Sequence, residues 1–355
     1  MMPETYKLYD DNIKLYSSMI KDIETAKKSI LLETYRFNAD MIGSKFRDAI
    51  TKAAKKGVKV KLLIDAWGSS SNDFFFRKLI LYGGEVRFFR RFKFKLKWFD
   101  YNHRRDHRKI LIIDGKIAYI GSTNIADESI TWRETNLRIT GRLAKKLIKA
   151  FNDNYEIHSA LIFDPKKHIY PIRQGNFEII RDVPSFIHQN VRDEEVLLFK
   201  KAKKEIIIET PYFIPDRQIR KSLKRAAKRG IKVKIILPAR SDVRIMDLLR
   251  DQFLGKLHRR GVRIYYYQPT ISHAKAVIVD NKYFLLGSSN LDFRSFIHQY
   301  EIMLLGSEKK IINQLKKHFQ ESLNDSEPFS YRKWKRRPLL QKIFETISSP
   351  FKNLF

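Results

Sequence analysis

His107-Arg108-Lys109-Ile110-Leu111-Ile112-Ile113-Asp114 and His273-Ala274-Lys275-Ala276-Val277-Ile278-Val279-Asp280 are two copies of one pattern. Each copy runs on into a Gly-Ser-x-Asn segment, which is residues 121–124 in the first and residues 287–290 in the second. The offset is 166 residues both from His107 to His273 and from Asn124 to Asn290. Because so specific a pattern recurs at one offset, the sequence predicts a duplicated domain.

The similarity between the two halves extends to the N-terminal side of this motif. Residues 26–37 read like residues 202–213, and residues 53–60 read like residues 226–233. A period of this length is too long for a solenoid or a propeller. We therefore expect two tandem homologous domains, each built from the same series of elements.

Each half also contains short apolar runs that are typical of buried strands. These candidate strands are residues 30–34, 59–65, 206–210 and 232–238. The runs that begin at Lys109 and Lys275 are expected to be strands as well. Side chains two apart along a strand point to one face, so each His-x-Lys pair presents both groups together. Strands that alternate with helical segments predict an α/β fold, with a mixed sheet flanked by helices in each domain.

Length and charge narrow the class of protein. The 355 residues carry 71 Lys and Arg against 39 Asp and Glu, which is a formal net charge of +32. Such a charge implies an anionic partner: a membrane surface, a nucleic acid or both. The chain has no cysteine, which excludes disulfides and thiolate metal sites. We expect a first domain at residues 1–163, a second at 164–329 and a basic amphipathic tail at 330–355.

Neither a signal peptide nor a membrane-spanning segment is expected. Residues 1–5 lack the apolar region of a signal peptide, and no stretch reaches 18 apolar residues. The expectation is therefore a cytoplasmic protein that is either soluble or peripheral to a membrane. Its oligomeric state stays open.

Two segments concentrate the positive charge. Arg87–Phe99 alternates basic and aromatic residues, and Tyr331–Phe355 has seven basic residues against the single acid Glu345. The first segment fits an amphipathic strand, a lip that dips aromatic residues into a bilayer, or a stacking surface for single-stranded nucleic acid. The second fits either a terminal helix packed on its domain or an interfacial helix on a membrane.

The residue types of the double motif suit reactions of a phosphodiester. Such a group is anionic and resists nucleophiles until positive donors neutralise it, and Lys109 and Lys275 are the candidates for that role. One motif histidine attacks phosphorus, and the other serves as acid and base. Glu134 and Glu301 follow the two motif copies and are expected to orient the histidines.

Four neutral polar residues of the motif complete the candidate site. The amides of Asn124 and Asn290 and the hydroxyls of Ser122 and Ser288 are expected to bind the substrate phosphate. No metal is expected, because the motif has no dense cluster of histidines and carboxylates and its lysines repel a cation. No cofactor is expected either.

On these residues the chain resembles the phospholipase D superfamily and, within it, the bacterial cardiolipin synthases. Beyond the paired motifs, the segments Trp132–Thr135, Glu209–Asp216 and Asn290–Phe296 are similar to stretches typical of those synthases. The resemblance covers residues 5–350. It implies two phospholipase D-like domains related by a pseudo-two-fold axis, with one shared active site at their interface.

The resemblance also implies roles for individual residues. His107 is the expected nucleophile, which forms a phosphohistidine, and His273 is the expected acid and base. Asp114 and Asp280 are expected to be structural. The implied reaction is that of a phosphatidyltransferase, which moves a phosphatidyl group from phosphatidylglycerol to a second lipid alcohol. The expected substrate is thus an anionic phospholipid, and the expected location is the cytoplasmic face of the cell membrane, as a peripheral protein.

The sequence departs from the family pattern at three places. Glu134 stands where the family usually has Asp, Ser122 stands where Gly is common, and residues 298–301 replace a stretch with an Asn before the Glu. These departures leave the acceptor lipid open. The alternatives are a hydrolase of the phospholipase D type, a nuclease of the same superfamily and a non-catalytic protein that binds anionic membranes. The intact double motif argues against the last.

Overall fold

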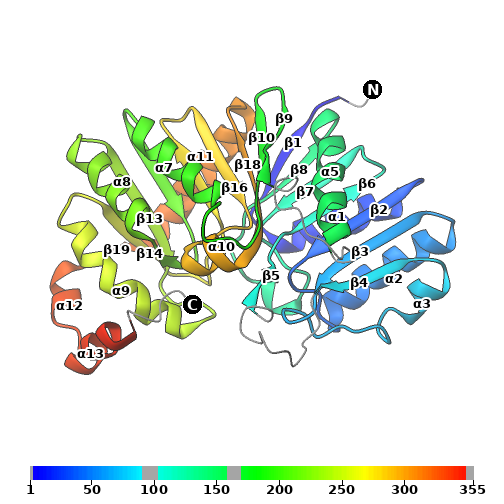
Figure 1. Cartoon of the computed structure of the whole chain (residues 1–355), viewed down its shortest axis with the longest axis horizontal. Coiled ribbons are helices and arrows are strands. Elements are labelled where there is room, and N and C mark those ends of the chain that lie inside the picture. Colours follow the sequence, from blue (N-terminus) through cyan, green and yellow to red (C-terminus); the bar gives the residue numbers. More distant parts are fainter. Residues whose placement is uncertain (1–2, 90–102, 158–168, 349–355) are drawn as a thin grey trace.

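The computed structural model describes residues 3–89, 103–157 and 169–348. Two large β-sheets stand side by side, each flanked by helices (Figure 1). The first sheet has the strand order β1-β8-β7-β6-β2-β3-β4. Its strands are β1 (Tyr6–Tyr9), β2 (Ser29–Thr34), β3 (Lys59–Asp65), β4 (Glu85–Phe89), β6 (Ile110–Ile113), β7 (Ile117–Gly121) and β8 (Asn136–Thr140).

The second sheet repeats this order and adds a strand at each edge. Its path is β19-β14-β13-β11-β15-β16-β18-β10-β9. Strand β2 pairs in parallel with β3, and β11 pairs in parallel with β13. Each of these two central strands also pairs antiparallel with the strand that follows the His-x-Lys motif, which is β6 or β15. The strands are β9 (Ile172–Gln174), β10 (Phe177–Asp182), β11 (Glu205–Glu209), β13 (Lys232–Pro238), β14 (Arg263–Tyr267), β15 (Ala276–Val279), β16 (Tyr283–Gly287), β18 (Gln299–Gly306) and β19 (Ser326–Pro328). The prediction of a duplicated, mixed α/β fold is confirmed.

The helices that follow equivalent strands also correspond. Helices α2 and α8 are capped by Asp40 and Asp216, whose carboxylates accept from the main-chain N–H groups of Gly43 and Ile219. The helices are α1 (Asn12–Glu24), α2 (Met41–Lys55), α3 (Arg77–Leu81), α5 (Arg142–Ile157), α7 (Asn190–Lys201), α8 (Arg217–Lys228), α9 (Arg244–His258), α10 (Phe293–His298), α11 (Lys309–Asn324), α12 (Tyr331–Lys335) and α13 (Leu339–Ser348).

Two of these helices lie at the junction of the two sheets. Helix α5 packs on strands of its own sheet and on β9 and β10 of the other, and α11 packs on its own sheet and on β1. Their buried side chains, such as Leu147, Phe151, Leu315 and Phe319, belong to one apolar core that takes in both sheets. Burial of this shared core holds the two halves together.

Main-chain hydrogen bonds cross the junction at the two histidines. The short strand β5 (Arg105–Asp106) pairs in parallel with the start of β18, and the N–H of His107 donates to the carbonyl of Tyr300 at 3.0 Å. The counterpart is the N–H of His273, which donates to the carbonyl of Arg133 at 2.8 Å. Each motif copy is therefore positioned by the backbone of the opposite half.

The structure describes little of the first basic segment and most of the second. Of Arg87–Phe99, the structure describes only the first three residues, which end β4, with Phe88 and Phe89 buried in the core. The proposed lip or stacking surface at residues 90–99 lies outside the described residues. The boundary between residues 163 and 164 also lies outside them.

The tail forms helices that pack on α9. The indole Nε1 of Trp334 donates to the carbonyl of Asp251 at 2.7 Å, and Arg337 forms a two-armed ion pair with the buried Glu345. The opposite side of α13 is exposed and apolar, with Leu340 80% exposed. Within residues 3–89, 103–157 and 169–348, no helix is long and apolar enough to cross a membrane.

Candidate active site

The structure brings the two motif copies together, and their histidines and glutamates pair across the junction. Nδ1 of His107 lies 2.9 Å from Oε1 of Glu301, and Nδ1 of His273 lies 2.8 Å from Oε1 of Glu134. Each glutamate therefore serves the histidine of the other half. When the glutamate is ionised it only accepts hydrogen bonds, so Nδ1 of the paired ring then carries the proton and Nε2 keeps its lone pair.

Both predicted serines are fully buried, and neither lines the cavity that contains the two histidines. The hydroxyl of Ser288 donates to Oε2 of Glu301 and accepts from the N–H of Ile302 at 2.9 Å. The hydroxyl of Ser122 accepts from the N–H of Thr135 at 3.0 Å. These contacts favour support of Glu301 by Ser288, and of the main chain next to each glutamate by both serines, over the predicted contact with phosphate.

The two lysines are buried within a few ångströms of the histidines. Nζ of each lysine donates to the carbonyl of its own motif histidine, at 2.7 Å for Lys109 and 3.0 Å for Lys275. Nζ of Lys275 also lies 3.0 Å from Nε2 of His273. Burial lowers the pKa of Lys109 to about 7, with the charge of Lys275 adding to the effect, and burial lowers the pKa of Lys275 to about 8. An anion that enters between them restores both charges, so the centre is built to receive one.

Burial in this centre also shifts the pKa values of both histidines and of Glu301. Burial, then the two lysines, holds the pKa of His107 well below its usual value. Burial also lowers the pKa of His273, although Glu134 opposes that shift. Burial raises the pKa of Glu301 to about 7. Neutral imidazoles beside cationic lysines are suited to attack on an anionic electrophile.

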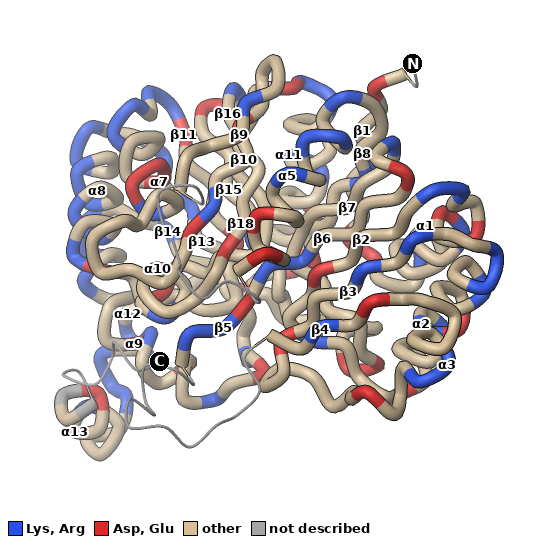
Figure 2. The backbone as a smooth tube through the Cα atoms, turned by 45° about the vertical axis from the view of Figure 1, so that its right-hand side comes forward, with Lys and Arg blue, Asp and Glu red and all other residues tan. Residues whose placement is uncertain are grey.

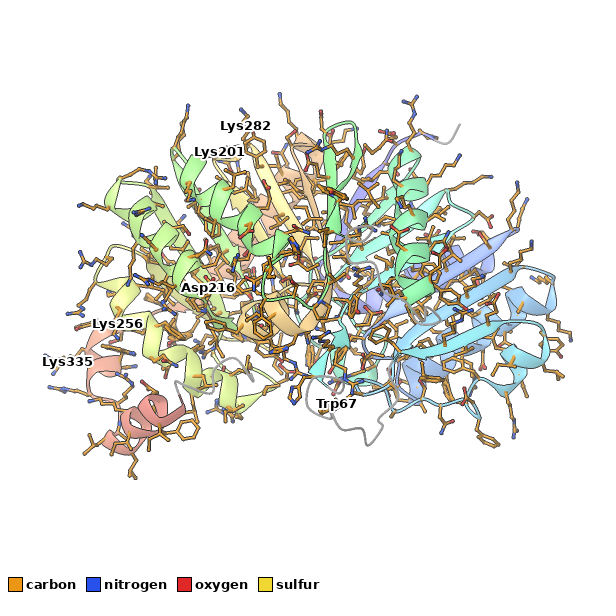
Figure 3. All side chains as sticks on the ribbon, viewed as in Figure 1. Trp67, Lys201, Asp216, Lys256, Lys282 and Lys335 are labelled. Atoms are coloured by element: carbon orange, nitrogen blue, oxygen red, sulfur yellow. The ribbon has the colours of Figure 1, made fainter. Side chains whose placement is uncertain are left out.

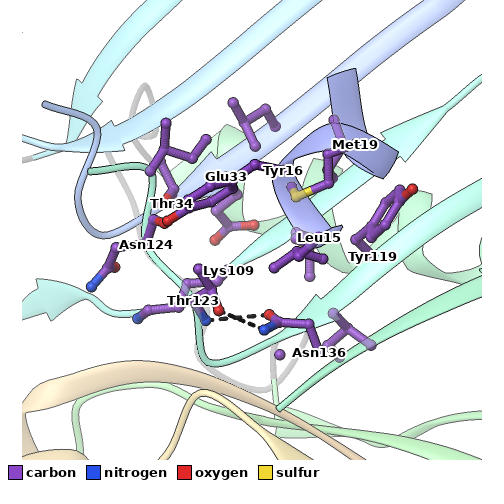
Figure 4. A pocket seen from close by; sticks show the side chains of 16 residues that line it. Leu15, Tyr16, Met19, Glu33, Thr34, Lys109, Tyr119, Thr123, Asn124 and Asn136 are labelled. Atoms are coloured by element: carbon purple, nitrogen blue, oxygen red, sulfur yellow. Dashed lines mark hydrogen bonds between the residues drawn. The ribbon is translucent and has the colours of Figure 1, made fainter. Parts of the chain in front are cut away.

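Asn124 and Asn290 are each held by hydrogen bonds with residues of their own half of the chain. The hydroxyl of Tyr16 donates to the carbonyl of Asn124 at 2.6 Å, and Thr123 exchanges hydrogen bonds with Asn136 in the small pocket behind Lys109 (Figure 4). On the other side, the hydroxyl of Ser295 accepts from the main-chain N–H of Asn290 at 3.2 Å. Within the part of the chain that is described, Oδ1 of Asn124 and Oδ1 of Asn290 have no hydrogen-bond partner.

The motif aspartates lie at the far ends of β6 and β15, away from the histidines. Asp114 has a φ of 54° and Asp280 a φ of 56°, both in the left-handed region. Each carboxylate accepts from three main-chain N–H groups, those of residues 27–29 and 203–205. Partial burial opposes the shift, but these N–H groups lower the pKa of both aspartates. The geometry agrees with the structural role that the resemblance implies.

A cavity of about 730 Å³, its open mouth included, lies over the two histidines. This is within the usual size of a ligand site. Both halves contribute to its lining, which includes His107, Asn124, Trp132, Tyr212, His273 and Asn290. Four of the six belong to the repeated motif. The candidate site is thus one chamber shared by the two domains.

Sequence reasoning missed several residues of this lining. Arg36, Tyr212, Asp242 and Arg294 border the cavity, and none was a candidate. The repeat held a signal for two of them, because Arg36 and Tyr212 occupy equivalent positions in residues 26–37 and 202–213. Asp242 follows β13 in a loop for which the repeat offers no match.

The described residues offer little to a metal ion. Across these ranges, no group of three or more His, Cys, Asp or Glu side chains has the arrangement of a metal site. The groups closest to the histidines are lysines and glutamates that are already paired.

Comparison with known proteins identifies the relatives of this chain. A family model described as "Cardiolipin synthase, PLD-like domain" matches residues 19–155 and 196–323. A cardiolipin synthase of Clostridium perfringens (strain SM101 / Type A) is 32% identical over 96% of this chain and 75% of its own length. One of Listeria innocua is 31% identical over 96% of this chain and 73% of its own length.

Solved structures extend the similarity of fold. The crystal structure of a phosphatidylserine synthase from Haemophilus influenzae matches with a TM-score of 0.80 at 16% identity, over 99% of this chain and 95% of that one. A polyphosphate kinase from Porphyromonas gingivalis matches with a TM-score of 0.64 at 10% identity, over 99% of this chain and 53% of that one. At these identities the likeness concerns the fold.

Proposed function

Since this chain belongs to the cardiolipin synthase family with phospholipase D-like domains, we propose that it moves a phosphatidyl group from phosphatidylglycerol to a second lipid alcohol. The observation that carries the proposal is the crossed pairing of two histidines with two glutamates around one anion-binding centre. A centre of this kind has one base that attacks and one acid that protonates, as transfer in two steps requires.

In the proposed first step, Nε2 of His107 attacks phosphorus. Lys109 and Lys275 neutralise the phosphoryl oxygens, and the amides of Asn124 and Asn290 add hydrogen bonds as charge builds there. His273 enters this step as the imidazolium, with Glu134 on Nδ1, and gives its Nε2 proton to the alcohol that leaves. In the second step, His273 takes a proton from the incoming alcohol, which attacks the phosphohistidine.

The choice of His107 as the nucleophile rests on the family resemblance. Lys109 and Lys275 each donate to the carbonyl of their own motif histidine, at 2.7 and 3.0 Å. Nζ of Lys275 also lies 3.0 Å from Nε2 and 3.2 Å from Nδ1 of His273, so it sits against the ring rather than along one lone pair.

The lipid products of the purified protein test the proposal. With vesicles of phosphatidylglycerol, mass spectrometry should find cardiolipin, and free glycerol should appear in equal amount. Phosphatidic acid as the main product would show that water, rather than a lipid alcohol, reaches the phosphohistidine, and the protein would then be a hydrolase. Cleavage of DNA without lipid turnover would instead make it a nuclease.

We also propose that the protein docks peripherally on the cytoplasmic face of an anionic membrane. Helix α13 presents Leu339, Leu340, Ile343 and Ile347 to solvent, beside the basic helix α12. Trp67, which is half exposed, lies along the same lower edge of the molecule (Figure 3). Apolar side chains beside cations are typical of surfaces that enter a lipid interface.

Positive charge alone does not identify the edge with α12 and α13 as the membrane-binding surface, because Lys and Arg are spread over other helices as well (Figure 2). Figure 2 shows Lys and Arg along α8 and over several helices of the first half. Such charge attracts any polyanion over long range. The exposed apolar residues of α13, rather than the net charge, therefore favour a membrane over a nucleic acid.

A further inference from the structure

The catalytic centre is nearly symmetric, but the residues at its two ends are different. The repeat aligns Arg36 of the first half with Tyr212 of the second, and both line the cavity. A phosphodiester also has two different ends, the acylated glycerol and the headgroup alcohol. The repeated motif presents the same groups to both ends of the phosphodiester. The residues that distinguish the acylated glycerol from the headgroup must therefore lie among the flanking side chains.

At the end beside His107 the flanking groups are two cations and the phenol of Tyr35, whose ring centroid lies 5.0 Å from that of His107, so the carboxylate of Asp242 is what sets the other end apart. Arg36 forms an ion pair with Glu128, and its Nε donates to the carbonyl of Gly68 at 3.2 Å. Arg294 also lines the cavity, and its charge joins burial and the two lysines in lowering the pKa of His107. This end suits the anionic part of a ligand.

At the end beside His273 the flanking pair is a phenol and a carboxylate. The hydroxyl of Tyr212 donates to Oδ1 of Asp242 at 2.6 Å, and both residues line the cavity. The ring centroids of Tyr212 and His273 are 6.4 Å apart. Burial lowers the pKa of His273, whereas the charges of Glu134 and Asp242 raise it. The carboxylate of Asp242 therefore acts on the end of the cavity where the acid–base histidine stands.

This pair is suited to hydroxyl groups. Burial, together with Asp242, raises the pKa of Tyr212 well above its usual value, so the phenol stays protonated. The phenol oxygen and the exposed carboxylate can accept further hydrogen bonds from the cavity. Neighbouring hydroxyls of a polyol donate to two such acceptors at once. An ammonium group also suits a carboxylate, but Lys109 and Lys275 repel a further cation.

We propose that Tyr212 and Asp242 form a subsite for a hydroxylated headgroup, a polyol of the size of glycerol, both as it leaves the donor lipid and as it arrives on the acceptor. This inference rests on the proposed function. In the first step a bond forms between Nε2 of His107 and phosphorus, and the bond from phosphorus to the headgroup oxygen breaks. That oxygen keeps the electron pair and takes a proton from His273. Attack and departure occur on opposite sides of phosphorus, which sets the headgroup on the His273 side.

The test uses three soluble donors that differ only in headgroup: dihexanoyl phosphatidylglycerol, phosphatidylethanol and phosphatidylethanolamine. The variants are Asp242→Asn and Tyr212→Phe, and the matched control is Asp193→Asn on α7, where the carboxylate is 58% exposed. Both variants should lower kcat/KM for the glycerol donor by roughly ten- to hundredfold, the usual worth of a hydrogen bond to a charged group. The ethanol donor should lose much less than the glycerol donor, because any effect of Asp242 on His273 is common to all three donors. Asp193→Asn should change neither.

Several results would overturn the subsite alone. Equal losses on the glycerol and ethanol donors would show that the pair only supports His273. An unchanged glycerol donor would show that the pair does not touch the headgroup. A wild-type preference for the ethanolamine donor that Asp242→Asn removes would make this a cation site. By contrast, a wild type that turns over none of the three donors would overturn the proposed function and the subsite with it. Thermal melts of each variant separate these outcomes from loss of fold.

Discussion

At the scale of single residues, the crossed histidine–glutamate pairs are the main feature that the sequence does not reveal. The spacing identified His107, His273, Glu134 and Glu301 as partners in one site. It could not show which glutamate serves which histidine, because that depends on how two distant segments meet. The structure pairs His107 with Glu301 and His273 with Glu134.

The first prediction concerns the two histidines. If they act as one unit, His107→Ala and His273→Ala should each remove nearly all turnover of a short-chain phosphatidylglycerol. The double variant should be little worse than either, since losses within a unit are not additive. The measurement is kcat/KM for all three variants. Substantial activity in either single variant would contradict a shared site.

The second prediction concerns Lys109 and pH. Because its pKa in the empty site is about 7, the amine loses its charge as the pH rises above 7. An anion then binds only with uptake of a proton, so Lys109 alone should lower affinity by up to tenfold per pH unit between pH 7 and 9. Lys275, whose pKa is about 8, should make the fall steeper above pH 8. Competitive inhibition by a dialkyl phosphate measures this, since its own charge is constant over that range.

Lys109→Arg is the matched control for the pH experiment. A guanidinium stays charged throughout this range, so the affinity of this variant should depend less on pH than that of the wild type. An affinity of the wild-type protein that stays level or rises between pH 7 and 9 would contradict the assigned role of Lys109.

At the scale of elements, the sequence predicted β6 and β15 well, because each begins at its His-x-Lys motif as a short apolar run. The apolar runs upstream of each motif also predicted β2, β3, β11 and β13. What could not be predicted is that β5 pairs with β18 across the junction. A two-residue strand has no periodicity of its own, and tertiary contacts create it.

The third prediction concerns the turns that follow these strands. Asp114→Ala removes an acceptor for three main-chain N–H groups, so the free energy of unfolding should fall by about 1–2 kcal/mol. Asp114→Asn keeps one oxygen acceptor and tolerates the left-handed φ, so its loss should be smaller. Urea denaturation measures both. An Asp114→Ala variant that keeps full stability but loses turnover would place this residue in the chemistry.

The fourth prediction concerns α13. Replacing Leu340, which is 80% exposed, and Ile347 by Glu should weaken sedimentation with phosphatidylglycerol vesicles, because charge replaces apolar side chains at the interface. Turnover of a soluble short-chain substrate should stay unchanged. Ile13→Glu, on the exposed side of α1, is the matched control. If the α13 variant binds vesicles as the wild type does, α13 has no role in membrane binding and serves only to pack on α9.

At the scale of the whole molecule, the duplication was visible in the sequence and is borne out by two sheets with the same central order of strands. The sequence also pointed to one centre between the halves. It could not show that α5 and α11 share one core across the junction, because an apolar helix face does not reveal its partner. Nor could the repeat predict Asp242, which lies where the halves diverge.

Trapping the covalent intermediate shows which half of the molecule supplies the nucleophile. A short-chain phosphatidylglycerol is mixed with the wild-type protein, the reaction is stopped in base during turnover, and the acid-labile adduct is mapped by mass spectrometry. We expect a phosphatidyl group on His107, present in the wild type and absent from His107→Ala. An adduct on His273, or steady turnover with no adduct on either histidine, would contradict it.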